Sequence, residues 1–116
     1  MGYRSNIVIY IEETEDTTLE QIIKGAFIAD NECYPDDYEI GKNKNGKRVL
    51  CVIYEDTKWY DSYPIVKYWE NIFKEIEEEH YLYTRQGENW SDIEIEGEYG
   101  YAYPIAEIEY DIDFIR

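Results

Sequence analysis

The sequence has little of what most enzymes need. Its 116 residues include a single histidine, His80, and only two cysteines, Cys33 and Cys51. The phosphate-binding patterns GxxxxGK[ST] and GxGxxG, the nucleophile pattern GxSxG and the zinc pattern HExxH do not occur in it. Without these signatures, we expect a protein that is not an enzyme and that carries no cofactor.

Basic residues are scarce as well. Eleven Lys and Arg stand against 27 Asp and Glu, which gives a formal net charge of −16. Recognition of nucleic acids and of anionic membranes depends on Lys and Arg that neutralise phosphates. The composition therefore predicts no direct binding to nucleic acid or membrane, and it favours a basic protein as the partner.

The two cysteines lie 18 positions apart and form no CxxC motif, so they do not indicate a disulfide framework. Reduced thiols are typical of a cytoplasmic protein. A catalytic pair would have to bring His80 to Cys33 or Cys51, yet Cys51 lies in an apolar run where it is expected to pack as a small hydrophobic residue. No run approaches the ~18 apolar residues of a membrane span, and no signal-peptide core follows Met1. We therefore expect a soluble cytoplasmic protein.

What the chain does have is apolar and aromatic residues in quantity. Hydrophobic residues make up 44% of it, and 14 Tyr, 3 Trp and 3 Phe are present. Such a chain is too apolar for a disordered acidic tail. Its length suits one domain over residues 1–116.

Hydrophobic patterns in the first half predict two kinds of element. Residues 6–11 are a continuous β-branched and aromatic run, typical of a central strand. Thr17 and Glu20 form a Thr-x-x-Glu capping box ahead of apolar residues at helical spacing, which predicts a helix over residues 18–29.

A hairpin is expected next in the chain. Residues 38–40 and 49–54 are predicted to pair across a turn at Asn45-Gly46. The connecting loop is the one basic patch of the chain. It contains Lys42, Lys44, Lys47 and Arg48.

The second half predicts a helix followed by a meander of strands. Pro64 suits the first turn of a helix that reaches about residue 79, with Asp61 or Ser62 as its cap and His80 at its end. Strands are expected over residues 81–85, 90–96 and 105–115. The fold class is α+β: a mostly antiparallel sheet of five to six strands with two helices packed on one face.

Carboxylates alternate with apolar residues in the last quarter of the chain, residues 88–116. Nine Asp and Glu occur there against Arg116 alone. Period-two alternation sends the apolar side chains to one face of a strand and the carboxylates to the other, so two adjacent strands would form an ordered acidic array. Tyr-rich residues connect them. The predicted partner-binding residues are Glu94, Glu96, Tyr99, Tyr101, Glu107, Glu109, Asp111 and Asp113.

The same spacing argues against a dedicated metal site. Alternate residues of one strand lie ~6.7 Å apart, which is too far for compact chelation of an ion. No EF-hand loop is present either, so we expect no bound metal.

Three short segments resemble a group of small, mostly uncharacterised bacteriophage proteins. They are the Met-Gly-Tyr-Arg-Ser start with Tyr3, Arg4 and Ser5, the segment Lys58, Trp59, Tyr60, Asp61, Ser62 and Tyr63, and the later Arg85, Gly87, Glu88 and Asp92. The resemblance implies a phage origin. It also favours a role against host defence, because several phage inhibitors of restriction and CRISPR complexes are small, acidic and imitate nucleic acid.

The same three segments suggest a different kind of site. If they converge at one end of the sheet, they would frame a charged pocket suited to a small ligand such as a nucleotide signal, or would simply form an ion-pair network that holds the sheet end. The residues of this alternative pocket are Arg4, Trp59, Tyr60, Asp61, Arg85 and Glu88.

Three functions are therefore open. The leading hypothesis is a non-enzymatic anti-defence inhibitor, anti-CRISPR or anti-restriction, whose acidic strands occupy a basic nucleic-acid-binding surface as a DNA mimic. The second is a protein-interaction or assembly module, with homo-oligomers formed between the acidic strands and the patch at 42–48. The third is a small-ligand binder that uses the alternative pocket.

The excess of negative charge predicts a salt effect on stability. Like charges this dense repel one another in the compact state, and added salt screens them. We expect the melting temperature to rise when NaCl is increased from about 20 mM to about 300 mM, as followed by circular dichroism. An unchanged melting temperature would contradict a crowded acidic surface.

Overall fold

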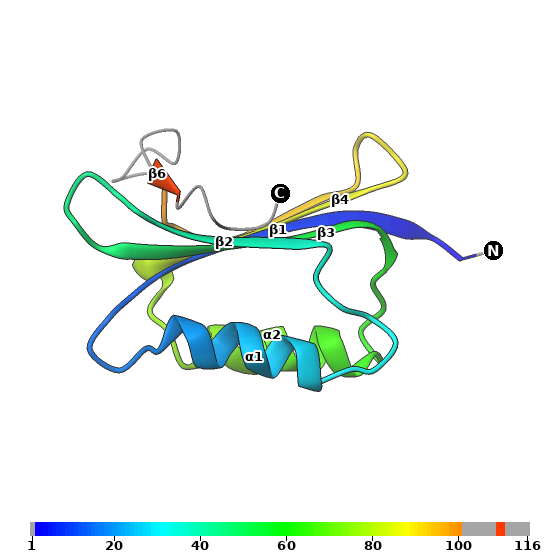
Figure 1. The fold of residues 1–116 in the computed structure, drawn as a ribbon. Coiled ribbons are helices and arrows are strands. Elements are labelled where there is room, and N and C mark those ends of the chain that lie inside the picture. Colours follow the sequence, from blue (N-terminus) through cyan, green and yellow to red (C-terminus); the bar gives the residue numbers. More distant parts are fainter. Residues whose placement is uncertain (1, 101–108, 111–116) are drawn as a thin grey trace.

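The computed structural model describes residues 2–100 and 109–110, and its elements are shown in Figure 1. The helices are α1 (Leu19–Ile28) and α2 (Pro64–Lys74), followed by a short 3-10 helix, η1 (Glu78–His80). The strands are β1 (Arg4–Glu12), β2 (Asp37–Lys42), β3 (Arg48–Lys58), β4 (Tyr81–Gly87), β5 (Ile93–Gly97) and β6 (Glu109–Tyr110).

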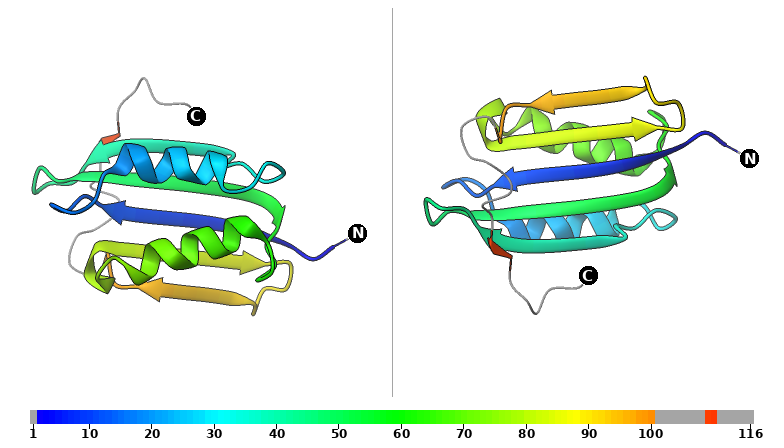
Figure 2. Two further views of the ribbon diagram at one scale, coloured as in Figure 1. Left: turned by 90° about the horizontal axis from the view of Figure 1, so that it is seen from below. Right: turned by 90° about the horizontal axis from the view of Figure 1, so that it is seen from above.

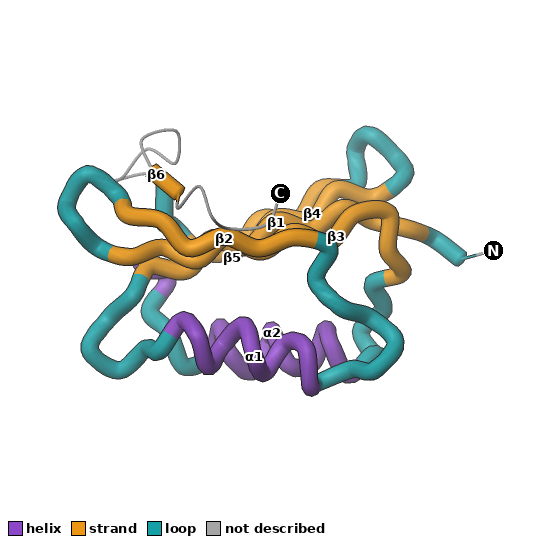
Figure 3. Tube along the Cα trace, viewed as in Figure 1, coloured by secondary structure: helices purple, strands orange, loops and turns teal. Residues whose placement is uncertain are grey.

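The elements form two layers. The six strands make one sheet in the order β5-β4-β1-β3-β2-β6, and each neighbouring pair is antiparallel. Both α-helices cover the same face of this sheet, as Figures 2 and 3 show. The predicted α+β fold is thus confirmed. We call the two sides of the sheet the helix face and the open face.

The centre of the sheet is β1, which pairs with β3 on one edge and with β4 on the other. Ile7, Ile9 and Ile11 point to the helix face and are fully buried, whereas Val8 and Tyr10 between them lie on the open face and are partly buried. The predicted central strand is confirmed, but the burial on both faces that its unbroken apolar run indicates is incomplete, because the helices cover only one face.

Hydrophobic residues at helical spacing bring both helices onto this core. α1 buries Leu19, Ile22, Ile23 and Ala26. α2 buries Ile65, Val66, Trp69 and Phe73. Trp69 donates its indole N–H to the hydroxyl of Tyr54 at 3.0 Å, so the largest side chain of the core keeps a hydrogen bond.

The predicted capping box at the start of α1 is wrong. Thr18 occupies the N-cap without a side-chain hydrogen bond to the helix. Thr17 bonds through its hydroxyl to Thr14 at 2.6 Å, and the Glu20 carboxylate pairs with Arg48 of β3. The box does not form because the Thr17 N–H donates to the Thr14 carbonyl at 3.2 Å and the Glu20 carboxylate pairs with Arg48.

Pro64 begins α2 as predicted, but the N-cap is Tyr63 rather than Asp61 or Ser62. The helix also stops at Lys74, several residues before the predicted end at about residue 79. Negative charge at a helix C-terminus is disfavoured by the helix dipole. Ending at Lys74 leaves Glu77 and its acidic neighbours outside the helix.

The β2–β3 hairpin is confirmed, with Asn43 organising its loop. The Asn43 Oδ1 accepts the backbone N–H groups of Asn45 at 3.0 Å and Lys47 at 3.1 Å. Gly46 has a φ of 80°, a conformation that favours glycine. Across the neighbouring edge, Lys42 lies in register with Glu109 of β6.

The chain leaves β5 toward the open face instead of turning back beside it. Gly97 has a φ of 88°, and a Cβ there would lie 2.1 Å from the carbonyl oxygen of Tyr81. Tyr99 is then 1% exposed, packs on the open face against Val49 of β3, and accepts a hydrogen bond from the Asn43 amide at 3.2 Å. The Tyr99 backbone N–H still donates to the Tyr81 carbonyl of β4 at 3.1 Å, so it is the Tyr99 side chain that reaches across the open face to β3.

The strand order overturns the predicted acidic hairpin. β5 and β6 lie at opposite edges of the sheet with four strands between them. At ~4.8 Å per strand, this places them about 24 Å apart. The carboxylates of the described strands therefore do not form one array on adjacent strands.

The bond between Trp69 and Tyr54 predicts a measurable cost. Tyr54 is 0% exposed, so Tyr54→Phe leaves a buried indole N–H without its acceptor. We expect the free energy of unfolding to fall by about 1–3 kcal/mol in urea denaturation. Tyr34→Phe, at a tyrosine that is 51% exposed, is the matched control and should change little. Equal stability of the two variants would contradict the account of the core.

Candidate functional site

Antiparallel pairing gathers three distant segments at one end of the sheet. Arg4 at the start of β1 lies in register with Lys58 at the end of β3. Ser5 lies in register with Gly87 at the end of β4. The three segments that the sequence predicts to converge at one end of the sheet are thus neighbours in space.

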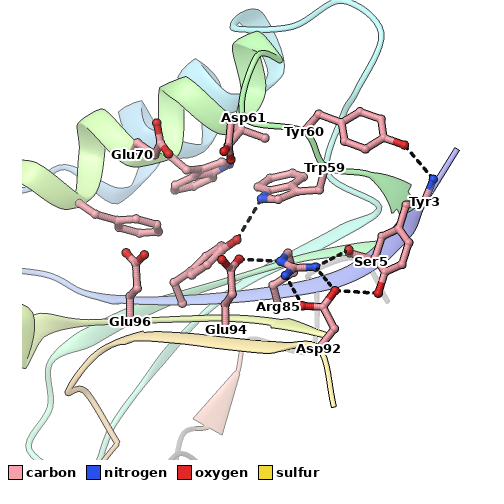
Figure 4. Close-up of a pocket in the computed structure, with 14 residues that line it drawn as sticks. Tyr3, Ser5, Trp59, Tyr60, Asp61, Glu70, Arg85, Asp92, Glu94 and Glu96 are labelled. Carbon is pink, nitrogen blue, oxygen red and sulfur yellow. Dashed lines mark hydrogen bonds and ion pairs between the residues drawn. The ribbon is translucent and has the colours of Figure 1, made fainter. Parts of the chain in front are cut away.

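A pocket of about 350 Å³ lies where these segments meet, between α2 and the β4–β5 side of the sheet (Figure 4). It is called the acidic pocket below. Its aromatic lining residues are Tyr3, Trp59, Tyr60, Trp69, Phe73 and Tyr83. Its other lining residues are Ser5, Asp61, Val66, Glu70, Arg85, Asp92, Glu94 and Glu96.

Trp59 and Tyr83 form part of the aromatic wall. The indole N–H of Trp59 donates to the hydroxyl of Tyr83 at 3.0 Å, and burial raises the pKa of Tyr83 above its usual range. The Trp59 ring also lies 4.9 Å from that of Tyr54. Because the Trp59 indole N–H is bonded inside the protein, the ring contributes an apolar surface to the pocket.

Arg85 is held at one side of the pocket by four hydrogen bonds (Figure 4). Its Nε donates to Glu94 at 2.6 Å and its Nη2 donates to Asp92 at 2.6 Å. Its Nη1 donates to Ser5 at 3.0 Å and to Asp92 at 3.2 Å. The bonds to Asp92 are the main cause of the raised pKa of Arg85, and the guanidinium and the Tyr3 hydroxyl lower the pKa of Asp92.

Three further carboxylates line the pocket. Asp61, Glu70 and Glu96 form no ion pair or side-chain hydrogen bond within the described part of the chain. Together with Asp92 and Glu94 they make five carboxylates against the one guanidinium of the described lining. A formal charge of −4 favours a cation in this pocket and disfavours a phosphate.

Four of the six residues of the predicted alternative pocket line the acidic pocket: Trp59, Tyr60, Asp61 and Arg85. Arg4 and Glu88 lie outside its lining and instead connect the start of β1 to the β4–β5 turn and to β3. The Glu88 carboxylate accepts the backbone N–H of Arg4 at 2.6 Å, and the Arg4 guanidinium donates to the carbonyl of Asp56 at 3.0 Å.

The predicted partner-binding residues are dispersed. Glu94 and Glu96 lie on β5 at the acidic pocket, Glu109 lies on β6 at the far edge, and Tyr99 is buried on the open face. The remaining members lie outside the described residues. They are Tyr101, Glu107, Asp111 and Asp113.

The alternation predicted for β5 is present, and it places the carboxylates on the helix face. Glu94 and Glu96 lie opposite Arg85 and Tyr83 and therefore share the helix face, while Ile93 and Ile95 lie on the open face and are more than half exposed. β5 is an edge strand, and on its helix face Arg85 attracts a carboxylate. Glu70, Trp69 and Phe73 of α2 also line the pocket, and the sequence did not predict this. The spacing of Trp69 and Phe73 indicates only a helix that faces the core, and no pattern distinguishes Glu70 from other surface carboxylates.

His80, Glu77 and Glu79 are the described residues that could hold a metal ion, since one ligand atom from each lies within 4.8 Å of the others. The His80 Nδ1 lies 2.8 Å from the carboxylate of Glu12, so Nε2 is the nitrogen left for an ion. The partner of His80 Nδ1 is thus a carboxylate and not a cysteine. The Cys33 thiol lies 3.6 Å from the Thr57 hydroxyl.

Comparison of the chain with protein-family models, with curated proteins and with solved structures gives no match. Within the described residues, no helix is both long enough and apolar enough to cross a membrane. The site must therefore be interpreted from its own geometry and charge.

The Arg85–Asp92 pair predicts a change of stability with pH. Because the pKa of Asp92 is lowered in the folded protein, the pair stabilises the fold above the ordinary carboxylate pKa of about 4, and this stabilisation is lost as the pH falls through the lowered value. We expect Asp92→Asn to destabilise the protein at pH 7 and to reduce the loss of stability on acidification. Urea midpoints at several pH values measure both effects.

Asp16→Asn, at an exposed carboxylate outside the pocket, is the control and should retain the wild-type pH dependence. If the curves of Asp92→Asn and the wild type stay parallel from pH 7 to about pH 2, the pair does not act as described.

Proposed function

We propose that this protein is a non-enzymatic inhibitor that binds the basic, nucleic-acid-binding surface of a host defence protein, of the CRISPR or restriction type. The observation that carries the proposal is a group of exposed carboxylates on and beside α2, η1 and β5, which is called the acidic edge below. It contains Glu70, Glu77, Glu78, Glu79, Glu94, Glu96 and Glu98.

Backbone contacts hold this acidic edge together. The N–H of Glu98 donates to the carbonyl of Glu78 at 2.6 Å, which fixes the end of β5 against η1. Within the described residues, Glu94 pairs with Arg85 and Glu79 lies 3.6 Å from His80, whereas the other carboxylates of the edge form no ion pair. The acidic edge therefore offers uncompensated negative charge on a rigid scaffold.

A protein that binds nucleic acid lines its channel with Lys and Arg to neutralise phosphates. The carboxylates of β5 recur every ~6.7 Å and are joined by those of η1, so their negative charges are regularly spaced on ordered elements. Long-range attraction would steer such a surface to a basic channel. The resemblance of three sequence segments to phage proteins favours a host defence protein as the partner that contains such a channel.

Neither alternative function fits the geometry as well. Assembly through the basic loop would use Arg48, which already pairs with Glu13 and Glu20 of the same chain. A nucleotide would meet five carboxylates in the acidic pocket, and the one arginine there already makes four hydrogen bonds. The pocket supports binding of a small group only if that group is cationic.

The proposal predicts displacement of DNA. We expect the protein to release DNA from at least one member of a panel of purified restriction and CRISPR effector proteins, as followed by mobility shift. Glu77→Lys with Glu98→Lys, both outside the acidic pocket, should weaken this inhibition by about tenfold or more.

Glu32→Lys with Glu55→Lys is the matched control, because it makes the same change of charge at exposed positions away from the acidic edge. Inhibition should survive it. The proposal is rejected if the wild-type protein releases DNA from no member of the panel, or if both double variants lose inhibition equally.

A further inference from the structure

The acidic pocket has a chemistry of its own beside the acidic edge. We infer that it binds the guanidinium group of an arginine side chain presented by the basic partner. The inference rests on the proposed function, because it names the group that the partner inserts.

The pocket lies where a docked partner would reach it. Glu70, Glu94 and Glu96 belong both to its lining and to the acidic edge. Figure 4 shows Glu94 and Glu96 pointing from β5 toward the helix side of the sheet, into the pocket. A basic surface that covers the edge therefore also covers the mouth of the pocket.

The charges of the pocket call for a donor-rich cation. Asp61, Glu70 and Glu96 form no ion pair within the described residues, and docking would remove water from them. A carboxylate that loses water without gaining a partner is costly. A guanidinium offers five N–H donors in one plane and can bond two carboxylates at once.

The aromatic wall selects arginine over lysine. Trp59 and Trp69 both line the pocket, and each indole N–H is already bonded to a tyrosine hydroxyl at 3.0 Å. Trp69 is 1% exposed and closes the pocket from the core side, whereas Trp59 retains some exposed surface. Tyr3 and Tyr60, which are 40% and 37% exposed, complete the accessible aromatic wall, and the π-electrons of such rings attract cations. A guanidinium stacks on aromatic rings and is weakly hydrated, whereas an ammonium group keeps its water more strongly.

Arg85 already shows that this end of the sheet accommodates a guanidinium. Ser5, Asp92 and Glu94 provide its four hydrogen bonds, and only 13% of its side chain is exposed. These bonds leave Arg85 compensated and unable to serve an anion. Asp61, Glu70 and Glu96 remain for a second guanidinium from outside.

The test measures binding of a single arginine group to the full chain. N-acetyl-argininamide is titrated by isothermal calorimetry, with N-acetyl-lysinamide and AMP as comparison ligands. We expect the arginine compound to bind with a Kd on the order of 1 mM, the lysine compound to bind several-fold more weakly, and AMP not to bind. Glu70→Gln with Glu96→Gln should lower the affinity for the arginine compound by about tenfold.

Glu75→Gln with Glu98→Gln is the control, since it makes the same change of charge at exposed residues outside the pocket. It should keep the affinity within about twofold, because salt screens charges at this range. The inference is overturned if the two double variants bind the arginine compound equally, or if AMP or the lysine compound binds as tightly.

The DNA-displacement assay separates this inference from the proposed function. If Glu77→Lys with Glu98→Lys loses inhibition while Glu70→Gln with Glu96→Gln keeps both inhibition and arginine binding, the pocket has no such role and the acidic edge alone acts. If the wild-type protein displaces no DNA, the proposed function is wrong. A partner protein as the source of the arginine is then ruled out as well, whatever the calorimetry shows for the pocket.

Discussion

The guanidinium of Arg85 compensates the negative charges of Asp92 and Glu94, which would otherwise repel each other across the β4–β5 turn. Through Ser5, Asp92 and Glu94 it joins β1, the β4–β5 turn and the edge strand β5 on the helix face of the sheet. With this one positive charge in place, Asp61, Glu70 and Glu96 stand around the same pocket without partners of their own. Arg85 thus fixes Asp92 and Glu94 in the pocket wall, and the other carboxylates keep the pocket negatively charged.

Leaving carboxylates uncompensated lowers the stability of a chain whose net charge is already −16. The buried core of Ile7, Ile9, Ile11 and Trp69 offsets this cost, because β1 is covered by both helices and paired on both edges. Several exposed carboxylates gather on and beside η1 and β5, although others, such as Glu15, Glu32 and Glu55, lie elsewhere on the surface. Concentrated negative charge on rigid elements is what recognition of a basic surface requires, and this links the fold to the proposed inhibition.

Much of the fold could be predicted from the sequence, because the strong periodic patterns have one physical reading. The apolar run of β1, the helical spacing in α1 and α2, and the Gly46 turn each depend on near neighbours in the chain. The side-chain direction of β5 depends on a distant residue instead: alternation defines two faces, and Arg85 decides which face takes Glu94 and Glu96. The position of β6 likewise depends on distant residues, because it pairs with β2 at the opposite edge of the sheet from β5. No sequence motif reveals Trp69 or Glu70 as pocket residues, because only the packing of the fold brings α2 beside β5.

The most direct test of the account uses the three tryptophans as internal reporters. Trp59 and Trp69 line the acidic pocket, whereas Trp90 is 89% exposed in the β4–β5 turn. Indole N–H signals of the ¹⁵N-labelled protein are followed by NMR while N-acetyl-argininamide is added. The account predicts saturable shifts for Trp59 and Trp69 and little change for Trp90. Shifts confined to Trp90, or equal for all three, would contradict binding of the guanidinium in the acidic pocket.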